Sequence, residues 1–378
     1  MEPIVTFVVP CYKLGHLLGE CLESILGQTF GDFEVLVLDD CSPDDTQQVA
    51  RSYRDPRIHY IRNQPNLGHL RNYNKGIGLA HGKYVWLISA DDRLRRPHIL
   101  ERYMDVLENN PRVGYAFCPG VGLENGQEVG VLKYSVHGER DWIRSGHEFF
   151  IKLLDGNSVI AASGIVRKEC YDKLGAFPLD LPYAGDWYLW CLFALHYDVA
   201  YLAEPMVHYR QHPQSMTNHL GRTDARIWAK DDLATLWRIK RKAEEAKFAR
   251  LEKCDEVIMK RSALFLTGSD LLGLKQGLSV EDFEQVVAEY ALSKAEAGAI
   301  CAGAYAVSGD EYYWQKRFPH ALKFYSQSLA KRPLNPRVAA QYILLRTGKF
   351  GVWAREAMLK LRPGASRMPQ QETVNTSQ

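Results

Sequence analysis

Short apolar runs alternate with helix-like segments along the N-terminal part of the chain, and this alternation constrains the fold more than any other feature. Strand-like runs rich in Val, Ile, Leu and aromatic residues occupy Ile4–Pro10, Phe33–Asp40, Arg57–Asn63 and Lys83–Ile88. Apolar residues at helical spacing follow the first run, over His16–Gln28. A chain that alternates in this way forms a parallel sheet with right-handed crossovers. The predicted fold class is therefore α/β, with a mostly parallel sheet flanked by helices.

Polar residues follow three of these runs, at the points where the predicted strands end. They form the sequences CYK (11–13), DDCS (39–42) and ADD (90–92). Ligands bind at the carboxyl ends of the strands in sheets of this type, so the three groups predict one shared site. A second interpretation stays open, because Asp and Ser also cap helices. The aspartates of DDCS and ADD would then only cap the helices that follow them.

The charge balance and the cysteines exclude several classes of protein. The 378-residue chain has a formal net charge of +2. It therefore lacks the basic field that binds nucleic acid, and no nucleic-acid partner is expected. Its 8 cysteines form no C-x-x-C pair, which predicts buried free thiols in a reducing compartment. No charged-then-apolar leader follows the first residues, and no uncharged apolar run reaches the ~20 residues that span a bilayer. These features predict a cytoplasmic protein.

The character of the sequence changes after about residue 220, where helical spacing replaces strand signals. We predict a first domain over residues 1–220, a helical C-terminal domain over 221–365 and a disordered tail over 366–378. The segment Tyr312–Pro336 resembles one tetratricopeptide unit in its spacing of small and aromatic residues. The C-terminal helices are candidates for self-association into a homo-oligomer.

Five ordered motifs resemble those of the family-2 glycosyltransferases, which have the GT-A fold. The motifs are VTFVVPCYK, VLVLDDCSPDDT, NLGHLRNYNKGIGLAHGKYVWLISADD, AGDWYLW and HYRQHPQSM, and together they cover about residues 3–217. The resemblance implies a Rossmann-like, mostly parallel sheet. It also implies an inverting, metal-dependent enzyme that moves a sugar from a nucleotide-sugar donor to a hydroxyl acceptor.

The resemblance assigns most of the polar residues at the strand ends to the donor. The nucleotide-sugar contacts that it implies are Pro10, Tyr12, Asp39, Asp40, Asn66, Arg71, Ala90, Asp91, Asp92 and Arg210. Tyr12 would stack on the base, and the paired carboxylates at 39–40 would accept hydrogen bonds from the base and the ribose. The guanidinium of Arg71 suits the diphosphate. The sequence departs from the family at Cys41, where the family has glycine, and at Lys13, where it prefers asparagine.

The metal and the catalytic base are also assigned by resemblance. SADD (89–92) stands where the family commonly has D-x-D-D, so Ser89 replaces one carboxylate. The resemblance implies that Asp91 binds Mn²⁺ or Mg²⁺, with His212 as a second ligand, and that the metal neutralises the leaving diphosphate. In AGDWYLW the family's general base corresponds to Asp186. The competing interpretation of Asp186 is the N-cap of its helix.

The implied partners are a UDP- or dTDP-sugar donor and a glycan or lipid-linked acceptor, in bacterial polysaccharide or surface-glycan assembly. The basic stretch WAREAMLKLRP (353–363) suggests peripheral contact with the inner face of the cell membrane. A sugar nucleotidyltransferase is disfavoured, because PCYKLGHLLGE lacks a Gly-rich basic loop. A non-catalytic scaffold that binds a partner through its helical region stays open because of Ser89. The presence of both Asp91 and Asp186 argues against a scaffold.

Overall fold

The computed structural model divides into two compact units, residues 1–257 and 258–378. It describes the chain except for residues 1, 213–224, 272–276, 349, 354 and 356–378. The predicted boundary at residue 220 and the predicted tail at 366–378 lie outside the described residues. Each unit is described here by itself.

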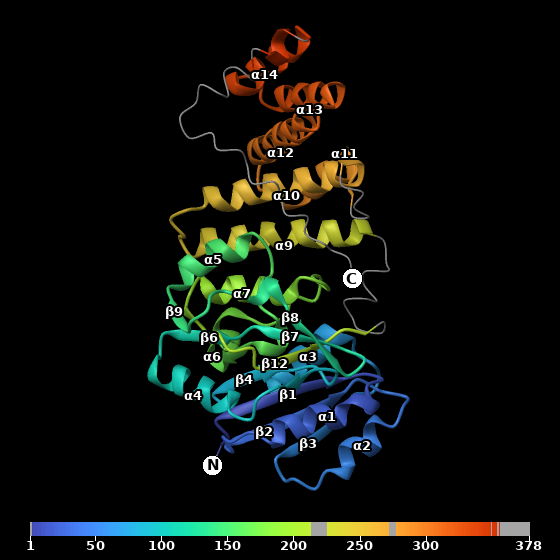
Figure 1. Ribbon diagram of the computed structural model, residues 1–378, viewed down its shortest axis with the longest axis vertical. Helices are drawn as coiled ribbons and strands as arrows, with labels where there is room; N and C mark the ends of the chain where they lie inside the picture. Colours follow the sequence, from blue (N-terminus) through green and yellow to red (C-terminus); the bar gives the residue numbers. More distant parts are fainter. Residues whose placement is uncertain (1, 213–224, 272–276, 349, 354, 356–378) are drawn as a thin grey trace. The chain divides into compact units, whose positions relative to one another are not determined.

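The first unit contains two sheets (Figure 1). The larger has eight strands in the order β3-β2-β1-β4-β10-β6-β11-β9, and the smaller has four in the order β5-β12-β7-β8. The strands are β1 (Val5–Cys11), β2 (Phe33–Asp39), β3 (Ile58–Arg62), β4 (Tyr84–Leu87), β5 (Arg93–Leu94), β6 (Val113–Phe117), β7 (Gly120–Glu124), β8 (Gln127–Val131), β9 (Trp142–Arg144), β10 (Ile165–Arg167), β11 (Asp198–Tyr201) and β12 (Val207–Arg210).

Helices and short 3₁₀ turns connect these strands. Those of the first unit are α1 (Gly15–Leu26), α2 (Thr46–Ser52), α3 (His69–Leu79), α4 (Ile99–Asn109), η1 (Lys133–Ser135), α5 (Gly146–Leu154), η2 (Ala161–Ser163), α6 (Lys168–Leu174), α7 (Gly185–Ala194) and α9 (Ala225–Glu245). Helix α10 (Glu252–Leu271) begins in the first unit and continues into the second.

Strand β1 shows why the first apolar run has no polar alternation. Phe7 belongs to the core cluster that includes residues of α1 and α4, whereas Val8 faces α3 on the opposite side. A β-carbon added at Gly76 of α3 would lie 2.4 Å from Val8 Cγ1, so α3 packs closely against the sheet. Because β1 is buried on both faces, it is apolar except for Thr6, whose hydroxyl donates to Glu34 Oε1 (2.6 Å).

The predicted α/β class is confirmed, but the sheet is more mixed than the strand–helix alternation suggests. Strands β3, β2, β1 and β4 are parallel, as predicted. Strand β10 is antiparallel to both of its neighbours, β4 and β6. The simple alternation of strand and helix stops after β4. The right-handed crossovers inferred from that alternation therefore could not be assumed for the remaining strands of the sheet.

The described part of the second unit is helical. It comprises the rest of α10 together with α11 (Val280–Tyr290), α12 (Lys294–Trp314), α13 (Phe318–Lys331) and α14 (Pro336–Arg346). Helices α12 and α13 pack through the rings of Tyr312 and Phe324, whose centroids are 5.5 Å apart. Ala321 and Tyr325 are fully buried, as a tetratricopeptide hairpin requires, although that assignment stays a prediction. None of the described helices is long and apolar enough to cross a membrane.

A buried ion pair holds the second unit together. The carboxylate of Asp310 accepts hydrogen bonds from Tyr325 Oη (2.6 Å), from Arg355 Nη2 (3.0 Å) and from Arg337 Nη2 (2.9 Å). The Arg355 side chain is only 7% exposed, and its guanidinium lies 3.5 Å from the ring centroid of Tyr313. A buried guanidinium without a counter-ion is costly, so Asp310 is the residue on which this packing depends.

Asp310→Asn is expected to lower the free energy of unfolding of the second unit by about 2 kcal/mol, because it leaves Arg355 buried without a counter-ion. Urea denaturation followed by circular dichroism measures this. Glu289→Gln, an exposed change on α11, serves as the control and should stay within about 0.5 kcal/mol of the unmodified protein. Equal stability of the two variants would show that the Asp310 cluster is not stabilising.

Candidate active site

The carboxyl ends of β1, β2 and β4 meet at one edge of the large sheet, as the sequence predicts. Backbone hydrogen bonds join the segments that leave this edge: Asp40 N–H donates to Cys11 O (2.9 Å), and Ala90 N–H donates to Pro10 O (3.1 Å). Pro10 and Ala90 are buried, and they contribute backbone to the site. The predicted contact residues from three distant parts of the chain therefore lie side by side.

Asp39 is fully buried and is held by three protein donors. Its Oδ1 accepts from the backbone N–H of Ser42 (2.8 Å), and its Oδ2 accepts from the hydroxyl of Tyr60 and from Arg62 Nη1 (2.7 Å). Burial and the bond to Asp39 raise the pKa of Tyr60 to about 12, so Tyr60 remains a donor at neutral pH. These donors fill three of the four acceptor sites of the carboxylate, so a nucleobase could bond only at the second lone pair of Oδ1. Contact between Asp39 and the donor thus stays a prediction.

Asp40 organises the NLG loop that follows β3. Its carboxylate accepts from the backbone N–H groups of Leu67 (2.7 Å) and Gly68 (2.9 Å) and from Asn63 Nδ2 (2.9 Å). The Asn66 amide donates to the carbonyl oxygen of Asp40 (2.7 Å). Asp40 therefore fixes the position of Asn66, and this bond network gives it a structural part in the site.

Besides Asn66, two predicted contact residues are exposed to solvent, Tyr12 and Arg71. Tyr12 is 44% exposed, and the ammonium of Lys13 lies 5.0 Å from its ring centroid. Arg71 is exposed on α3, two residues from the start of the helix. Both side chains are available for the base-stacking and phosphate-binding parts that the resemblance implies.

Neither aspartate pair caps a helix, so the competing interpretation of these motifs is wrong. Helix α2 begins at Thr46, after the N-cap Asp45, and no side chain caps it. Helix α4 begins at Ile99, well beyond Asp92, and its N-cap is His98. The carboxylates at the strand ends therefore lie at the sheet edge and do not cap the helices that follow.

Cys41 has a left-handed backbone, with φ of 65°, at the position where the family has glycine. This conformation costs an L-residue about 1–2 kcal/mol, whereas glycine adds about 0.4–1 kcal/mol of chain entropy to the unfolded state. Cys41→Gly is therefore expected to raise the free energy of unfolding by about 0.5–1 kcal/mol in urea denaturation. Cys41→Ala keeps the unfavourable backbone and should give no gain, and an equal gain from both changes would contradict this explanation.

The predicted metal ligands lie together. His212 Nε2 is 3.0 Å from Asp91 Oδ2, and the two side chains are 17% and 14% exposed. Burial acts to raise the pKa of Asp91, but the bonds from His212 and Ser89 outweigh it and lower that pKa. Asp91 is thus ionised and partly accessible, as a ligand of a hard cation must be. Ser215, in the same late motif, lies outside the described residues.

Arg210 supports the SADD segment from within the protein. Its backbone N–H donates to Asp92 Oδ1 (2.9 Å), and its Nε donates to the carbonyl oxygen of Asp91 (2.8 Å). Its Nη2 pairs with Glu20 of α1 (2.8 Å), and the side chain is 9% exposed. The three bonds give Arg210 a structural role, and its predicted contact with the diphosphate stays a prediction.

Asp186 is the second residue of α7, and the N-cap of that helix is Ala184. The N-cap interpretation is therefore wrong, although Asp186 Oδ1 accepts from the backbone N–H of Trp187 (2.7 Å) in the first turn. Its Oδ2 accepts from Asn157 Nδ2 (2.8 Å). Burial raises the pKa of Asp186 against these two bonds. Trp187 is 2% exposed and belongs to the core.

A divalent cation fits this site if it also has ligands from a substrate. The described residues contain no group of three or more His, Cys, Asp and Glu side chains that could hold a metal. Asp91 and His212 supply two donors. Mg²⁺ needs only one or two carboxylates from a protein and takes its remaining ligands from water and substrate phosphates. The pair is therefore suited to an ion that arrives with a diphosphate.

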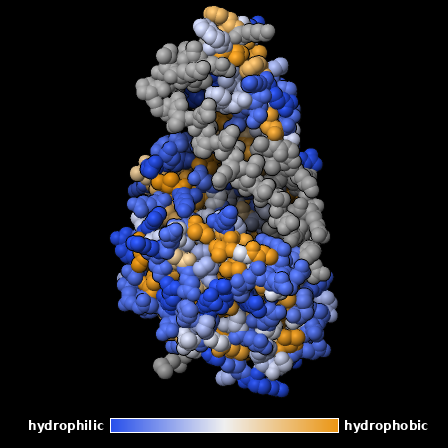
Figure 2. All heavy atoms as spheres, viewed as in Figure 1, coloured by the Kyte–Doolittle hydropathy of each residue, from blue (hydrophilic) through white to orange (hydrophobic). Residues whose placement is uncertain are grey.

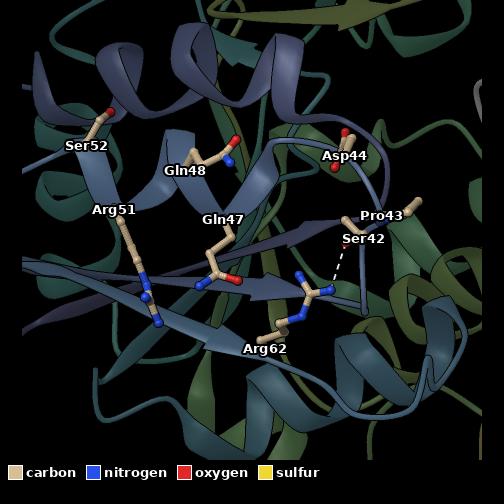
Figure 3. Close-up of a pocket in the computed structure, with 8 residues that line it drawn as sticks. All are labelled: Ser42, Pro43, Asp44, Gln47, Gln48, Arg51, Ser52 and Arg62. Carbon is tan, nitrogen blue, oxygen red and sulfur yellow. Dashed lines mark hydrogen bonds between the residues drawn. The ribbon is translucent and has the colours of Figure 1, made fainter.

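A pocket of about 620 Å³ opens beside β3 and α2 (Figure 3). Its lining residues are Ser42, Pro43, Asp44, Gln47, Gln48, Arg51, Ser52 and Arg62. Arg62 donates to the Ser42 carbonyl oxygen (2.8 Å) and to Asp39, so the pocket adjoins the buried end of the predicted base site. Neither Asp91 nor Asp186 lines it, and the predicted chemistry lies elsewhere.

The sequence analysis missed three residues that shape the site: Glu20, Arg62 and Asn157. Arg62 pairs in register with Asp39 across parallel strands β2 and β3, so a predicted register could have found it. The sequence carries no signal for the other two, because their partners Arg210 and Asp186 come from distant parts of the chain.

The fold and the site define an α/β domain of the GT-A type with carboxylates at the carboxyl edge of its sheet. Residues 6–167 match the profile of the family described as Glycosyl transferase family 2. This part of the chain is a domain of that family, as the five motifs predict.

The chain is also similar in sequence to other proteins, one of which is named as a glycosyltransferase. An uncharacterized protein of Mycobacterium tuberculosis is 37% identical over 118 residues, which are 31% of this chain and 36% of that protein. An uncharacterized glycosyltransferase of Rickettsia typhi is 25% identical over 234 residues, or 60% of this chain and 71% of the relative. The chain thus spans about a third of the length of the first of these relatives.

Solved structures of Staphylococcus aureus TarS share the fold. TarS residues 1–349 in complex with UDP-GlcNAc give a TM-score of 0.61 at 18% identity, over 88% of this chain and 92% of that chain. The complex with UDP gives 0.58 at 20% identity, over 84% and 92%. At these identities the likeness establishes the fold alone.

Proposed function

We propose that the chain is an inverting, metal-dependent glycosyltransferase of the hexosyl type. It moves a sugar from a nucleotide-sugar donor to a hydroxyl group, in the assembly of a bacterial polysaccharide or surface glycan. One observation carries the proposal: the two predicted metal ligands meet at the carboxyl edge of the sheet, where His212 Nε2 lies 3.0 Å from Asp91 Oδ2. Burial is the main cause of the raised pKa of Tyr73, and the charges of Asp91, Asp186 and Asp92 all add to it. These shared effects on Tyr73 support a single site for the predicted metal ligand and the predicted base.

Asp186 is the group that accepts the proton of the acceptor hydroxyl as the oxygen attacks the anomeric carbon. A single base with in-line displacement inverts the anomeric configuration. Asp91 and His212 would hold the metal ion, which neutralises the charge that develops on the leaving diphosphate. Tyr12 and Arg71 are the exposed residues that would position the base and the phosphates.

A uridine nucleotide is the first donor to test. TarS, which has the same fold, was crystallised with UDP and with UDP-GlcNAc. We keep UDP- and dTDP-sugars together as donor candidates, because uracil and thymine present the same hydrogen-bonding groups and a carboxylate such as Asp39 cannot tell them apart.

An apolar surface beside Asp186 favours an acceptor with an apolar portion, such as a lipid-linked glycan. Val129, Val131, Tyr134 and Val136 are each at least 43% exposed. Figure 2 shows hydrophobic side chains gathered near the middle of the visible face, where β7 and β8 lie in Figure 1. The segment that carries these four residues continues to His137. The His137 ring forms a hydrogen bond with the carbonyl oxygen of Ser158 (3.0 Å), and Ser158 follows Asn157, which donates to Asp186.

Membrane contact and the cytoplasmic location remain proposals, as does self-association through the C-terminal helices. Most of WAREAMLKLRP lies outside the described residues, and its Arg355 is buried in the second unit. The basic stretch of α9 is ion-paired within the first unit: Arg238 pairs with Asp180, and Lys240 pairs with Asp255. This stretch therefore offers no argument for an anionic membrane.

The test is release of nucleoside diphosphate from a panel of UDP- and dTDP-sugars, with Mn²⁺, with Mg²⁺ or with EDTA, together with calorimetric binding of each nucleotide. We expect one donor to bind and to be hydrolysed slowly only when metal is present. A second candidate function is a non-catalytic scaffold, because Ser89 stands where the family commonly has a metal-binding carboxylate. A chain that binds no nucleotide under any of these conditions would be that scaffold.

A further inference from the structure

Asn157 makes a directed hydrogen bond to Asp186. Asn157 lies in the loop between α5 and η2, and its Nδ2 donates to Asp186 Oδ2 (2.8 Å). Its Oδ1 accepts from the backbone N–H of Val159 (3.2 Å). Because a carbonyl oxygen must face that N–H, the amide nitrogen must face Asp186. The loop backbone therefore fixes the end of the amide that meets the carboxylate.

The bond completes the protein's hold on Asp186. The backbone N–H of Trp187 donates to Oδ1 and Asn157 donates to Oδ2, so among the described residues each oxygen has one donor from another residue. Each oxygen retains a second lone pair that can accept a proton or a further hydrogen bond. The Trp187 donor is part of the helix itself, whereas Asn157 belongs to a separate loop. The Asn157 bond therefore ties the direction of the carboxylate to a second segment of the chain.

From this geometry we infer that Asn157 is a positioning residue, which orients Asp186 and keeps it ionised so that it can accept a proton. Its part in the reaction rests on the proposed function. The hydrogen bond and its effect on the charge of Asp186 do not, and they can be tested separately. Asparagine is the suitable residue here, because an aspartate would place a second negative charge beside the first.

The titratable groups around Asp186 do not compete with this effect. Tyr73 of α3, Tyr134 of η1 and Cys191 of α7 are the groups on which its charge acts. The pKa of each of these groups is raised, so all three stay neutral when Asp186 titrates. Burial also raises the pKa of Asp186, and the bonds from Trp187 and Asn157 lower it. Loss of the Asn157 amide should therefore raise the pKa of Asp186 further.

The test is a direct titration of Asp186 by NMR in protein labelled with ¹³C at the aspartate carboxyl carbons. The signal is assigned by its absence in Asp186→Asn. We expect the midpoint to rise by about one pH unit in Asn157→Ala, which removes a donor to a charged group. It should rise further in Asn157→Asp, which adds a like charge. An unchanged midpoint in both variants would overturn the inference whether or not the chain transfers a sugar.

The chain offers a matched control. Asn109 Nδ2 donates to Asp105 Oδ1 (2.9 Å) on the exposed surface of α4, so this pair repeats the same contact away from the site. Asn109→Ala and Asn109→Asp should leave the midpoint of Asp186 unchanged. A shift of equal size in these variants would mean that the Asn157 variants act through net charge or general destabilisation, and the inference would then fail.

Kinetics then report on the function. At neutral pH we expect Asn157→Ala to lower the rate of nucleoside diphosphate release about tenfold or more, with no change in the KM for the donor. The acid limb of its pH–rate profile should move upward with the NMR midpoint, so that part of the lost rate returns at higher pH. A rate that falls equally at every pH would indicate a purely structural role for Asn157 and overturn the inference.

Discussion

Asp186→Asn is expected to lower the rate of sugar transfer by about 1,000-fold while donor binding stays within about twofold of that of the unmodified protein. General base catalysis contributes about 10²–10⁴ in rate, and asparagine cannot accept the proton. The substitution keeps the shape of the side chain, and in the part of the chain that the structure describes Asp186 accepts from Asn157 and Trp187. Nothing in that arrangement is needed to hold a nucleotide.

Transfer is measured as nucleoside diphosphate released from the donor that the panel selects, and affinity by calorimetry. Asp105→Asn on α4 is the matched control, since Asp105 also accepts from an asparagine amide and lies on an exposed surface. It should retain full activity. If Asp186→Asn keeps more than about a tenth of the rate, another group is the base.

The part of the site built from neighbouring strands could be predicted from the sequence. The mostly apolar runs that end at Pro10, Asp39 and Leu87 lie side by side in one parallel sheet, and their composition is typical of strands that are buried on both faces. Parallel strands place their carboxyl ends at the same edge, so the residues after them come together without further information.

The tasks of the individual carboxylates could not be predicted in this way. Asp39 and Asp40 are adjacent in sequence, yet Asp39 is held by β3 side chains and Asp40 by the backbone of the following loop. Asp91 is partly accessible, whereas Asp92 is buried against the backbone N–H of Arg210. Alternation along the chain turns neighbouring side chains in opposite directions, and which one meets solvent depends on segments far away in the sequence.

The motif HYRQHPQSM was predicted to bind the donor, and the smaller sheet explains why it also has a structural role. Strand β12 pairs with β5, which directly follows Asp92, and with β7. This pairing carries Arg210 under the SADD segment and brings His212 to Asp91. Two-residue strands such as β5 have no periodic signal, so the sequence cannot reveal the sheet that aligns these residues.

Asp91→Ala is expected to raise the Mn²⁺ concentration needed for half-maximal rate by about 100-fold or more and to lower the maximal rate by a similar factor. Asp91 is the charged member of the proposed metal pair, and a neutral imidazole cannot replace a carboxylate for a hard cation. His212→Ala should have a smaller effect, about tenfold, because Asp91 remains. Titrations of nucleoside diphosphate release against Mn²⁺ measure both variants.

Asp92→Asn separates metal binding from the structure of the loop. Its new amide oxygen can still accept from the backbone N–H of Arg210, so we expect its Mn²⁺ requirement to stay within about threefold of that of the unmodified protein. We therefore expect the increase in the Mn²⁺ requirement to be largest for the substitution at Asp91, smaller at His212 and smallest at Asp92. An equal Mn²⁺ shift for the substitutions at 91 and 92 would mean that both act by disturbing the SADD segment, and an enzyme that works fully in EDTA would remove the metal from the mechanism.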